Sequence, residues 1–361
     1  MDLLVQNDLK FLEKECVNLS TLKRKDRENL LLWYNNNKLD FPWRVFWKEL
    51  GNPFHIWVSE VMLQQTLIKV VVPIYIRFIK KFPDVLAFAK ASEEEIRPYV
   101  KGLGYYRRFA LLHKGAKEIT STGEVVWPNS YASWLNVSGV GVYTASAISS
   151  IVLNEKQGVL DGNVERVFSR IFNIYLPMDE KGLKAKYQDL ANKYLITKNP
   201  GDYNQALMEL GQRVCTKNDP ECGVCMLQSS CLSYKYKTQA IIPIPKKRKK
   251  IQEVLINLNI LRFGSEFLLI QRSKKAKFLK EKLGFYSPEI EKEACLKLSK
   301  QQEKTYLGSF THNITHHKIK AKVFLFDLKK KVLASNIKYV KQKNLAQIII
   351  SNLDQKTLDL L

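Results

Sequence analysis

Four cysteines within seventeen positions are the feature that most constrains this chain. The stretch CTKNDPECGVCMLQSSC covers residues 215–231 and has the spacing C-x6-C-x2-C-x5-C. Zinc sites usually pair two short C-x2-4-C knuckles, and only one such knuckle is present here. Cubane iron–sulfur clusters need four thiolates, commonly from one compact loop. The spacing therefore favours an iron–sulfur cluster over structural zinc, with the ligands Cys215, Cys222, Cys225 and Cys231.

The charge of the chain indicates the kind of partner it binds. Its 361 residues carry a net charge of +23, which points to a polyanion unless the sequence is simply rich in surface lysine. The remaining cysteines, Cys16 and Cys295, stand alone in the sequence, which favours a reducing cytoplasm over a secreted disulfide framework. The start MDLLVQNDLKFLEKEC lacks signal-peptide features, and no apolar run of about 18 residues occurs, so we expect no membrane span.

Periodicity predicts two regions of different fold class. After a polar extension, residues 1–28, helical patterns separated by Pro and Gly turns fill residues 29–236. The Pro-containing basic stretch 237–250 has the composition of a linker. Residues 251–361 predict a small α/β domain, with 21 basic and 10 acidic residues, a β-hairpin around Gly264–Ser265, a strand in IKAKVFLFDL and one terminal helix in LAQIIISNLDQKTLDLL.

Two glycine-containing stretches have the composition of DNA-binding loops. NVSGVGVYTASA, residues 136–147, predicts a helix–hairpin–helix in which Gly139 and Gly141 let backbone amides approach a phosphate. The alternative is a plain junction between two helices. KGLGYYRR, residues 101–108, combines glycines, tyrosines and arginines, as in loops that stack on bases and bind phosphate. Its alternative is a helix C-cap with surface aromatic residues.

Two carboxylates occupy positions suited to acid and electrostatic roles. Glu60 lies in the largely apolar helical stretch WVSEVMLQQT, where it is either a solvated surface residue or a desolvated acid able to donate a proton. Asp161 begins the helical stretch DGNVERVFSR, where it is either a plain N-cap or a carboxylate facing a developing positive charge.

Taken in order, these stretches resemble the MutY-type adenine DNA glycosylases of the endonuclease III superfamily. The resemblance covers about Leu30 to Cys231 and rests on LLLWYNNNKLDFPWR, WVSEVMLQQT, GLGYY, GVGVYTASA, LDGNVERV, YNQALMELGQRVC and the four cysteines. It implies a mainly α helix–hairpin–helix glycosylase region with a [4Fe–4S] loop at residues 215–231. It also implies a monomer that binds double-stranded DNA containing adenine opposite 8-oxoguanine or guanine.

The resemblance also implies roles for individual residues. Glu60 would protonate adenine and Asp161 would stabilise the oxocarbenium-like sugar, with support from Tyr143 and Asn163. Trp43, Arg44 and Gln205 would line the pocket for the extruded base. The remaining implied DNA contacts are Gln64, Gln65, Leu103, Tyr105, Gly139 and Gly141. Lyases of the superfamily carry a Schiff-base lysine at the position of Tyr143, so a monofunctional glycosylase is favoured.

Residues 251–361 resemble the Nudix-like C-terminal domain of that family, without the carboxylate-rich box that Nudix hydrolases need for metals. The resemblance implies a recognition domain whose 8-oxoguanine loop contains Thr315 and His316, or, in an overlapping alignment, Phe310-Thr311-His312. Two alternative functions stay open from the residues. One is an endonuclease III-like glycosylase and lyase for oxidised pyrimidines, and the other is a non-catalytic DNA-binding iron–sulfur protein.

Overall fold

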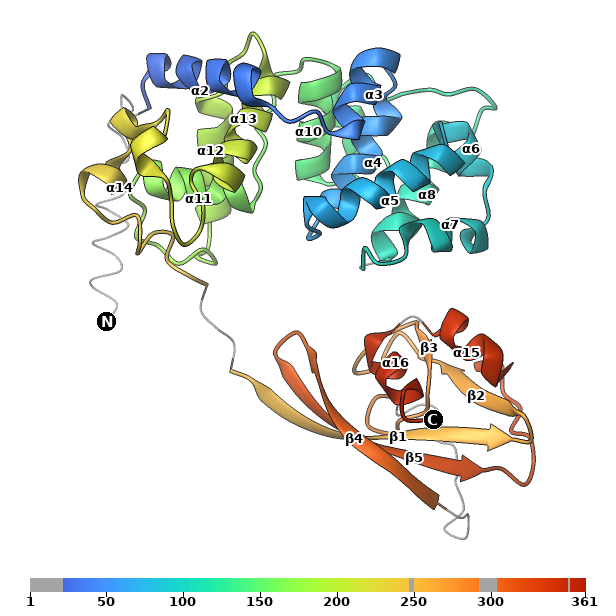
Figure 1. Ribbon diagram of the computed structural model, residues 1–361. Helices are drawn as coiled ribbons and strands as arrows, with labels where there is room; N and C mark the ends of the chain where they lie inside the picture. The colour runs from blue at the N-terminus through green and yellow to red at the C-terminus, as the bar shows by residue number, and fades with distance from the viewer. Residues whose placement is uncertain (1–21, 105, 247–249, 292–303, 350) are drawn as a thin grey trace. The chain divides into compact units, whose positions relative to one another are not determined.

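The chain folds into two compact units, Met1–Lys247 and Arg248–Leu361, called the helical unit and the sheet unit below. The computed structural model describes residues 22–104, 106–246, 250–291, 304–349 and 351–361 (Figure 1). Cys16, Tyr105 and Cys295 therefore lie outside the described residues, as does most of the stretch 1–28. Helix α2 (Arg24–Asn37) already begins inside that stretch. None of the described helices is both long enough and apolar enough to cross a membrane.

The first part of the helical unit surrounds one hydrophobic core. Local signals start its helices: Pro42 and Pro53 occupy first-turn positions, and Ser92 forms a capping box with Glu95. The buried aromatic side chains of this core include Trp57 and Trp134, whose rings meet edge to face. Its helices are α3 (Pro42–Leu50), α4 (Pro53–Leu63), α5 (Ile68–Lys81), α6 (Val85–Lys90), α7 (Glu93–Val100), α8 (Arg107–Ile119), α9 (Tyr131–Leu135) and α10 (Val142–Val152).

A second hydrophobic core lies between α2 and the later helices of the same unit. These are α11 (Gly162–Ile171), α12 (Leu183–Lys193), α13 (Pro200–Arg213) and α14 (Leu232–Lys235). The cysteine loop packs on this second core through Cys215 and Cys225. Helix α10 contacts both α4 and α13, so it joins the two cores (Figure 1).

The stretch that follows α14 continues along the helical unit. The Thr238 hydroxyl donates to Asn173 Oδ1 at 2.6 Å, and Arg170 Nε donates to the Ile242 carbonyl at 2.8 Å. Ile244 forms an isolated parallel bridge with Pro177. Much of the stretch 237–250 is thus fixed to the helical unit, and the boundary between the units falls at Lys247.

The sheet unit is built on one mixed sheet with the strand order β3-β2-β1-β5-β4, and β6 pairs with β2. The predicted hairpin is present: β1 (Gln252–Phe263) pairs antiparallel with β2 (Glu266–Gln271), and Gly264 in the turn has φ 57°. β5 (His317–Asp327) contains the predicted strand and runs parallel to β1. The other strands are β3 (Leu283–Gly284), β4 (Lys304–Ile314) and β6 (Ile337–Lys341).

Residues 345–361 do not form the single terminal helix that the sequence predicted. They contribute to two helices, α15 (Gln342–Ile348) and α16 (Asn352–Leu358) (Figure 1). Leu345 and Leu353 of these helices pack into one core with the sheet. The Ser351 hydroxyl begins α16 by accepting from the Asp354 amide. The Asp354 carboxylate in turn makes a buried ion pair with Arg272 at 2.8 Å. A capped second helix therefore replaces a continuous one. The mainly α region followed by a small α/β domain is otherwise confirmed.

Candidate active site

Glu60 is buried within α4, not solvated on its surface. Asn52 caps this helix by accepting from the Phe54 amide, and every residue from Phe54 to Met62 is buried. The Glu60 side chain is only 7% exposed. Burial raises the pKa of its carboxyl group to about 7, although a hydrogen bond from Tyr143 opposes the rise. At neutral pH the proton-donating form of Glu60 is therefore well populated.

The Tyr143 hydroxyl links Glu60 to the helix–hairpin–helix. Tyr143 lies in the first turn of α10 and donates to Glu60 Oε2 at 2.7 Å. The predicted hairpin is formed by α9, the turn that contains Gly139 at φ 83°, and Gly141 as the N-cap of α10. A Cβ at position 139 would come within 2.7 Å of Leu111, so glycine is required there by space as well as by backbone conformation. The helix–hairpin–helix and the buried acid are thus joined by one phenol.

Asp161 is the N-cap of α11, as the sequence predicted, and its carboxylate is held from several directions. Oδ1 accepts from the backbone amides of Asn163 at 2.9 Å and Val164 at 2.8 Å, and Oδ2 accepts from Asn163 Nδ2 at 2.8 Å. Burial raises the pKa of Asp161, and these hydrogen bonds lower it. Burial, followed by the charges of Glu60 and Asp161, raises the pKa of Tyr143, and the charge of Asp161 also raises the pKa of Glu60. The two carboxylates therefore share one electrostatic environment.

A buried ionic network surrounds the residues expected to line a base pocket. Arg44 donates from Nε to Gln205 Oε1 at 2.8 Å and from Nη1 to Glu209 Oε1 at 2.5 Å. Glu209, which is 3% exposed, also pairs with Arg213. Trp43 is buried and stacks on Phe41. Sequence reasoning missed Glu209, although its spacing of four residues from Gln205 places both on one face of α13.

The other expected DNA contacts lie in two turns. Gln64 follows α4 and donates from Nε2 to Thr144 Oγ1 at 3.3 Å, and Gln65 has φ 55°. In the GLGYY turn, the Leu103 side chain is buried in the first core, so that side chain does not face solvent. Tyr105 lies outside the described residues.

Thr315 and His316 occupy the tight turn between β4 and β5 in the sheet unit. Thr315 is exposed with φ 54°, and its Oγ1 lies 3.4 Å from His316 Nδ1. The overlapping alternative, Phe310-Thr311-His312, lies within β4, where Thr311 pairs with Lys320 of β5. Only the first alignment therefore forms a loop.

The four cysteines of the cysteine loop line one hollow together with Arg170. Burial, followed by the charge of the neighbouring thiols, raises the pKa of Cys225 to about 12 and that of Cys231 to about 11. Four thiols that line one hollow are the donor set that a cubane iron–sulfur cluster needs. Helix α11 holds this loop: Arg170 Nη1 donates to Cys215 Sγ at 3.4 Å, and Arg166 Nε donates to the Cys215 carbonyl at 2.9 Å.

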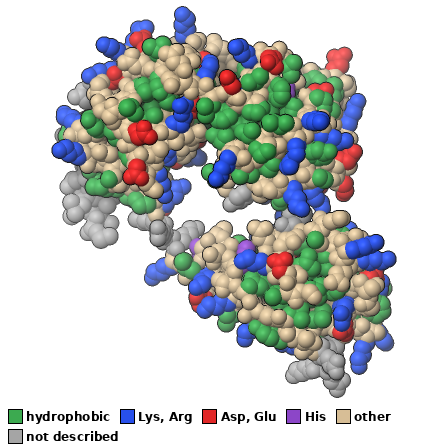
Figure 2. Space-filling view, in the orientation of Figure 1, with side chains coloured by type: hydrophobic (Ala, Val, Ile, Leu, Met, Phe, Trp, Pro, Cys, Tyr) green, Lys and Arg blue, Asp and Glu red, His purple; other side chains and the backbone are tan. Residues whose placement is uncertain are grey.

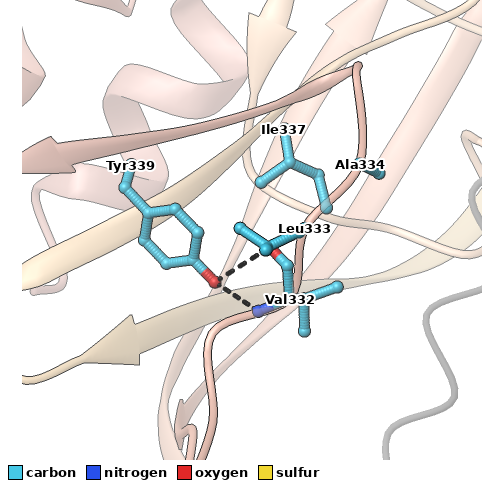
Figure 3. Close-up of a pocket in the computed structure, with 5 residues that line it drawn as sticks. All are labelled: Val332, Leu333, Ala334, Ile337 and Tyr339. Atoms are coloured by element: carbon cyan, nitrogen blue, oxygen red, sulfur yellow. Dashed lines mark hydrogen bonds between the residues drawn. The ribbon is translucent and has the colours of Figure 1, made fainter.

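A hollow of about 360 Å³ in the sheet unit is distinct in character (Figure 3). Its lining carries no acidic or basic side chain, and the Tyr339 hydroxyl donates to the Val332 carbonyl at 3.4 Å. Lysine and arginine side chains are spread over the visible surface of both units, with few acidic ones between them (Figure 2).

Residues 58–193 match the family described as HhH-GPD superfamily base excision DNA repair protein. A solved thermostable thymine-DNA glycosylase is 26% identical, with a TM-score of 0.51 over 59% of this chain and 98% of that one. A trapped endonuclease III–DNA covalent intermediate, at 18% identity and a TM-score of 0.50 over 60% of this chain and 96% of that one, shares the fold. Residues 58–193 of this chain are thus similar to the HhH-GPD superfamily.

Within that superfamily the similarity is to MutY-type proteins, which confirms the resemblance found in the sequence. The mouse protein named adenine DNA glycosylase is 38% identical over 236 residues, 64% of this chain and 46% of the mouse protein. The Arabidopsis thaliana protein of the same name is 32% identical over 366 residues, 84% of this chain and 56% of that protein. The chain thus spans about half the length of these two relatives.

Proposed function

We propose that this chain is a base-excision repair DNA glycosylase that removes adenine from duplex DNA by hydrolysing its N-glycosidic bond. The observation that carries the proposal is the buried Glu60 carboxyl group, which Tyr143 contacts at 2.7 Å beside the N-capping Asp161. The net charge of +23 supports a polyanionic partner. Two proteins named adenine DNA glycosylase are 38% and 32% identical to this chain over 236 and 366 residues.

The arrangement supports different roles for the carboxyl groups of Glu60 and Asp161. The target adenosine must leave the base stack before a side chain can reach it. Glu60 then donates its proton to N7 of adenine, so the base departs as a neutral species when the C1′–N9 bond breaks. The sugar becomes oxocarbenium-like, and the Asp161 carboxylate stabilises that positive charge. Water adds at C1′ and releases a proton, which restores the acid form of Glu60.

The same residues support hydrolysis without strand cleavage. A lyase needs an amine that forms a Schiff base with the sugar, and the phenol of Tyr143 cannot form one. The hydroxyl instead points to Glu60. Borohydride trapping tests this assignment: efficient covalent capture on DNA would favour the endonuclease III-like alternative.

The test of the proposed function is a single-turnover assay on a duplex that contains one adenine opposite 8-oxoguanine. We expect full-length protein to leave an abasic site at that adenine, detected by alkaline cleavage of the labelled strand. Protein that binds this duplex and leaves the adenine in place would instead support a non-catalytic DNA-binding role.

We further infer that the protein acts in the cytoplasm, because Cys16 and Cys295 stand alone in the sequence. We infer that it acts as a monomer, because one chain supplies both of the carboxylates that the proposed mechanism needs.

The sheet unit is the part of the chain that we assign to reading the base opposite adenine. Its turn at Thr315 presents a hydroxyl at the tip of a hairpin, and this unit carries 21 basic and 10 acidic residues in 251–361. A hydroxyl can donate to or accept from an edge of 8-oxoguanine that guanine lacks. The preferred substrates are therefore adenine opposite 8-oxoguanine and adenine opposite guanine.

Thr315→Val should reduce the preference for 8-oxoguanine over guanine by roughly 2- to 10-fold, the effect of losing one hydrogen bond. Valine has the same β-branched shape as threonine, so the backbone strain at φ 54° is the same in the variant as in the unsubstituted protein. Single-turnover rates on the two duplexes give the ratio. Thr311→Val removes the same atom from β4 and should leave the ratio unchanged. A loss in Thr311→Val without one in Thr315→Val would assign the reading loop to the overlapping alignment.

We also propose that Cys215, Cys222, Cys225 and Cys231 hold a [4Fe–4S] cluster that stiffens the loop against DNA and takes no part in hydrolysis. Anaerobically purified protein should be yellow-brown and contain about four irons and four sulfides per chain. Cys225→Ser should lower the iron content, because serine replaces a buried ligand, and Cys295→Ser should not. Stoichiometric zinc without iron in the unsubstituted protein would contradict the cluster assignment.

A further inference from the structure

Two turns of the helical unit meet although they are far apart in the sequence. One follows α4 and contains Gln64, Gln65 and Thr66, and the other follows α7 and contains Leu103. The Thr66 hydroxyl donates to the Leu103 carbonyl at 3.2 Å across a separation of 37 residues. Both turns contain left-handed backbone, at Gln65 (φ 55°) and at Gly104 (φ 65°). Glycine adopts this backbone without strain, but at Gln65 it persists only where surrounding contacts hold it.

The Arg108 side chain supplies those contacts to both turns at once. Its Nη1 donates to the Gln64 carbonyl. Its Nη2 donates to Thr66 Oγ1 at 2.9 Å and to the Leu103 carbonyl at 2.9 Å. The guanidinium group also lies 4.9 Å from the centre of the Phe109 ring. Arg108 is partly buried, and its bonds are directed to the protein itself. The neighbouring Arg107 is exposed.

The chemistry of the contacts selects arginine. Three acceptors from two turns lie around one planar group, which offers donors in a fixed fork. A lysine ammonium at the same place is a compact point charge and cannot match that fork. Arg108 therefore fixes the separation of the two turns, whereas a surface arginine that binds phosphate would need its fork free.

We propose that Arg108 is a positioning residue that makes the two turns act as one wedge, so that both enter the duplex together when the target adenine is extruded. The inference rests on the proposed function, because the first turn carries Gln64 and Gln65, which are expected to fill the gap that the adenine leaves. Without the fork, each turn inserts separately and the extruded state forms more slowly.

Extrusion can be measured apart from excision. The duplex carries 2-aminopurine beside an adenine opposite 8-oxoguanine, and its fluorescence rises when the neighbouring stack opens. In full-length protein that carries Glu60→Gln, which blocks excision, Arg108→Gln should slow the fluorescence rise by roughly 10- to 100-fold at saturating protein, the range for losing hydrogen bonds from a charged donor. In protein that keeps Glu60, Arg108→Gln should slow excision. The pH at which excision is half-maximal should stay at the value of the unsubstituted protein.

Arg107→Gln is the matched control, since it removes the same charge from the neighbouring exposed position. It should weaken binding in a salt-dependent way and leave the extrusion rate at saturating protein unchanged. Arg108→Lys should keep the affinity and still extrude slowly. Thr66→Val removes one acceptor of Arg108 together with the hydroxyl that donates to the Leu103 carbonyl, and it keeps the Arg108 side chain, so it tests the link between the turns in a second variant. The double substitution should slow extrusion by less than the product of the two single effects.

Three results would overturn the inference. The first is extrusion by Arg108→Gln and Thr66→Val at the unsubstituted rate. The second is an Arg108→Gln defect that disappears at saturating protein, as expected for a phosphate contact. The third is a shifted pH midpoint of excision, which would indicate a disturbed Glu60 instead of a slower extrusion. Unsubstituted protein that binds the duplex yet neither extrudes nor excises adenine would overturn the proposed function, and the wedge with it.

Discussion

Glu60→Gln should lower the single-turnover rate of adenine excision by about 10²- to 10⁴-fold, the usual effect of losing one general acid. The substitution keeps the size of the side chain and removes the proton that the base needs in order to leave. Glu94→Gln makes the same chemical change on the exposed face of α7 and should excise at the unsubstituted rate. Binding of both variants to the mispaired duplex, measured by fluorescence anisotropy, should match that of the unsubstituted protein.

The pH dependence of excision follows from the same carboxyl group. In the proposed mechanism Glu60 works in its protonated form, and its pKa is raised to about 7 by burial. The rate should therefore be highest below that pH and fall as the pH rises through it. The hydrogen bond from Tyr143 lowers this pKa, so Tyr143→Phe should move the fall to higher pH. Near-normal excision by Glu60→Gln would remove Glu60 from the mechanism, whatever the pH profile shows.

Asp161→Asn should lower the excision rate by about 10²- to 10³-fold, the range for removing one electrostatic contact to a transition state. Asparagine caps helices about as well as aspartate, so a residue that serves only as an N-cap would tolerate the change. Asp84→Asn is the matched control. Asp84 caps α6 by accepting from the Ala87 amide at 2.8 Å, and the same substitution there should leave the rate unchanged.

Thermal unfolding completes the comparison of the two aspartates. Both asparagine variants should unfold within a few degrees of the unsubstituted protein, because each retains a capping side chain. If Asp161→Asn lost activity only in proportion to a lost folded fraction, the residue would be a structural cap. A large loss of rate in fully folded protein separates the catalytic role from the structural one.

The features that the sequence predicted best are local ones, which depend on residues close together in the chain. Asp161 could be placed as an N-cap because the apolar period that follows it begins at once, and the β1–β2 hairpin could be placed because Gly264 marks its turn. Each of these features depends on residues within one or two turns of the chain. The burial of Glu60 stayed open from the sequence, because the apolar character of α4 does not show whether other elements cover every face of the helix.

Contacts between residues that are distant in the chain could not be predicted from the sequence. The Arg44–Glu209 pair joins residues separated by 165 positions, and no local pattern connects them. The break between α15 and α16 likewise depends on Asp354, whose ion pair with Arg272 spans 82 positions. Leu103 resembled a loop residue in sequence, yet tertiary packing buries it. Sequence periodicity shows which face of an element is apolar but not which element covers it.

The two hydrophobic cores of the helical unit have a consequence for how activity is lost. Glu60 belongs to a helix of the first core and Asp161 to a helix of the second, and α10 contacts both sides. Proteins open in cooperative parts as well as globally. A subglobal opening that undocks α10 from α13 would separate the carboxylates while most helical hydrogen bonds survive. We therefore expect excision activity to be lost on heating before helicity is lost. The half-life of the proposed activity should depend on the contact between α10 and α13 more than on either core alone.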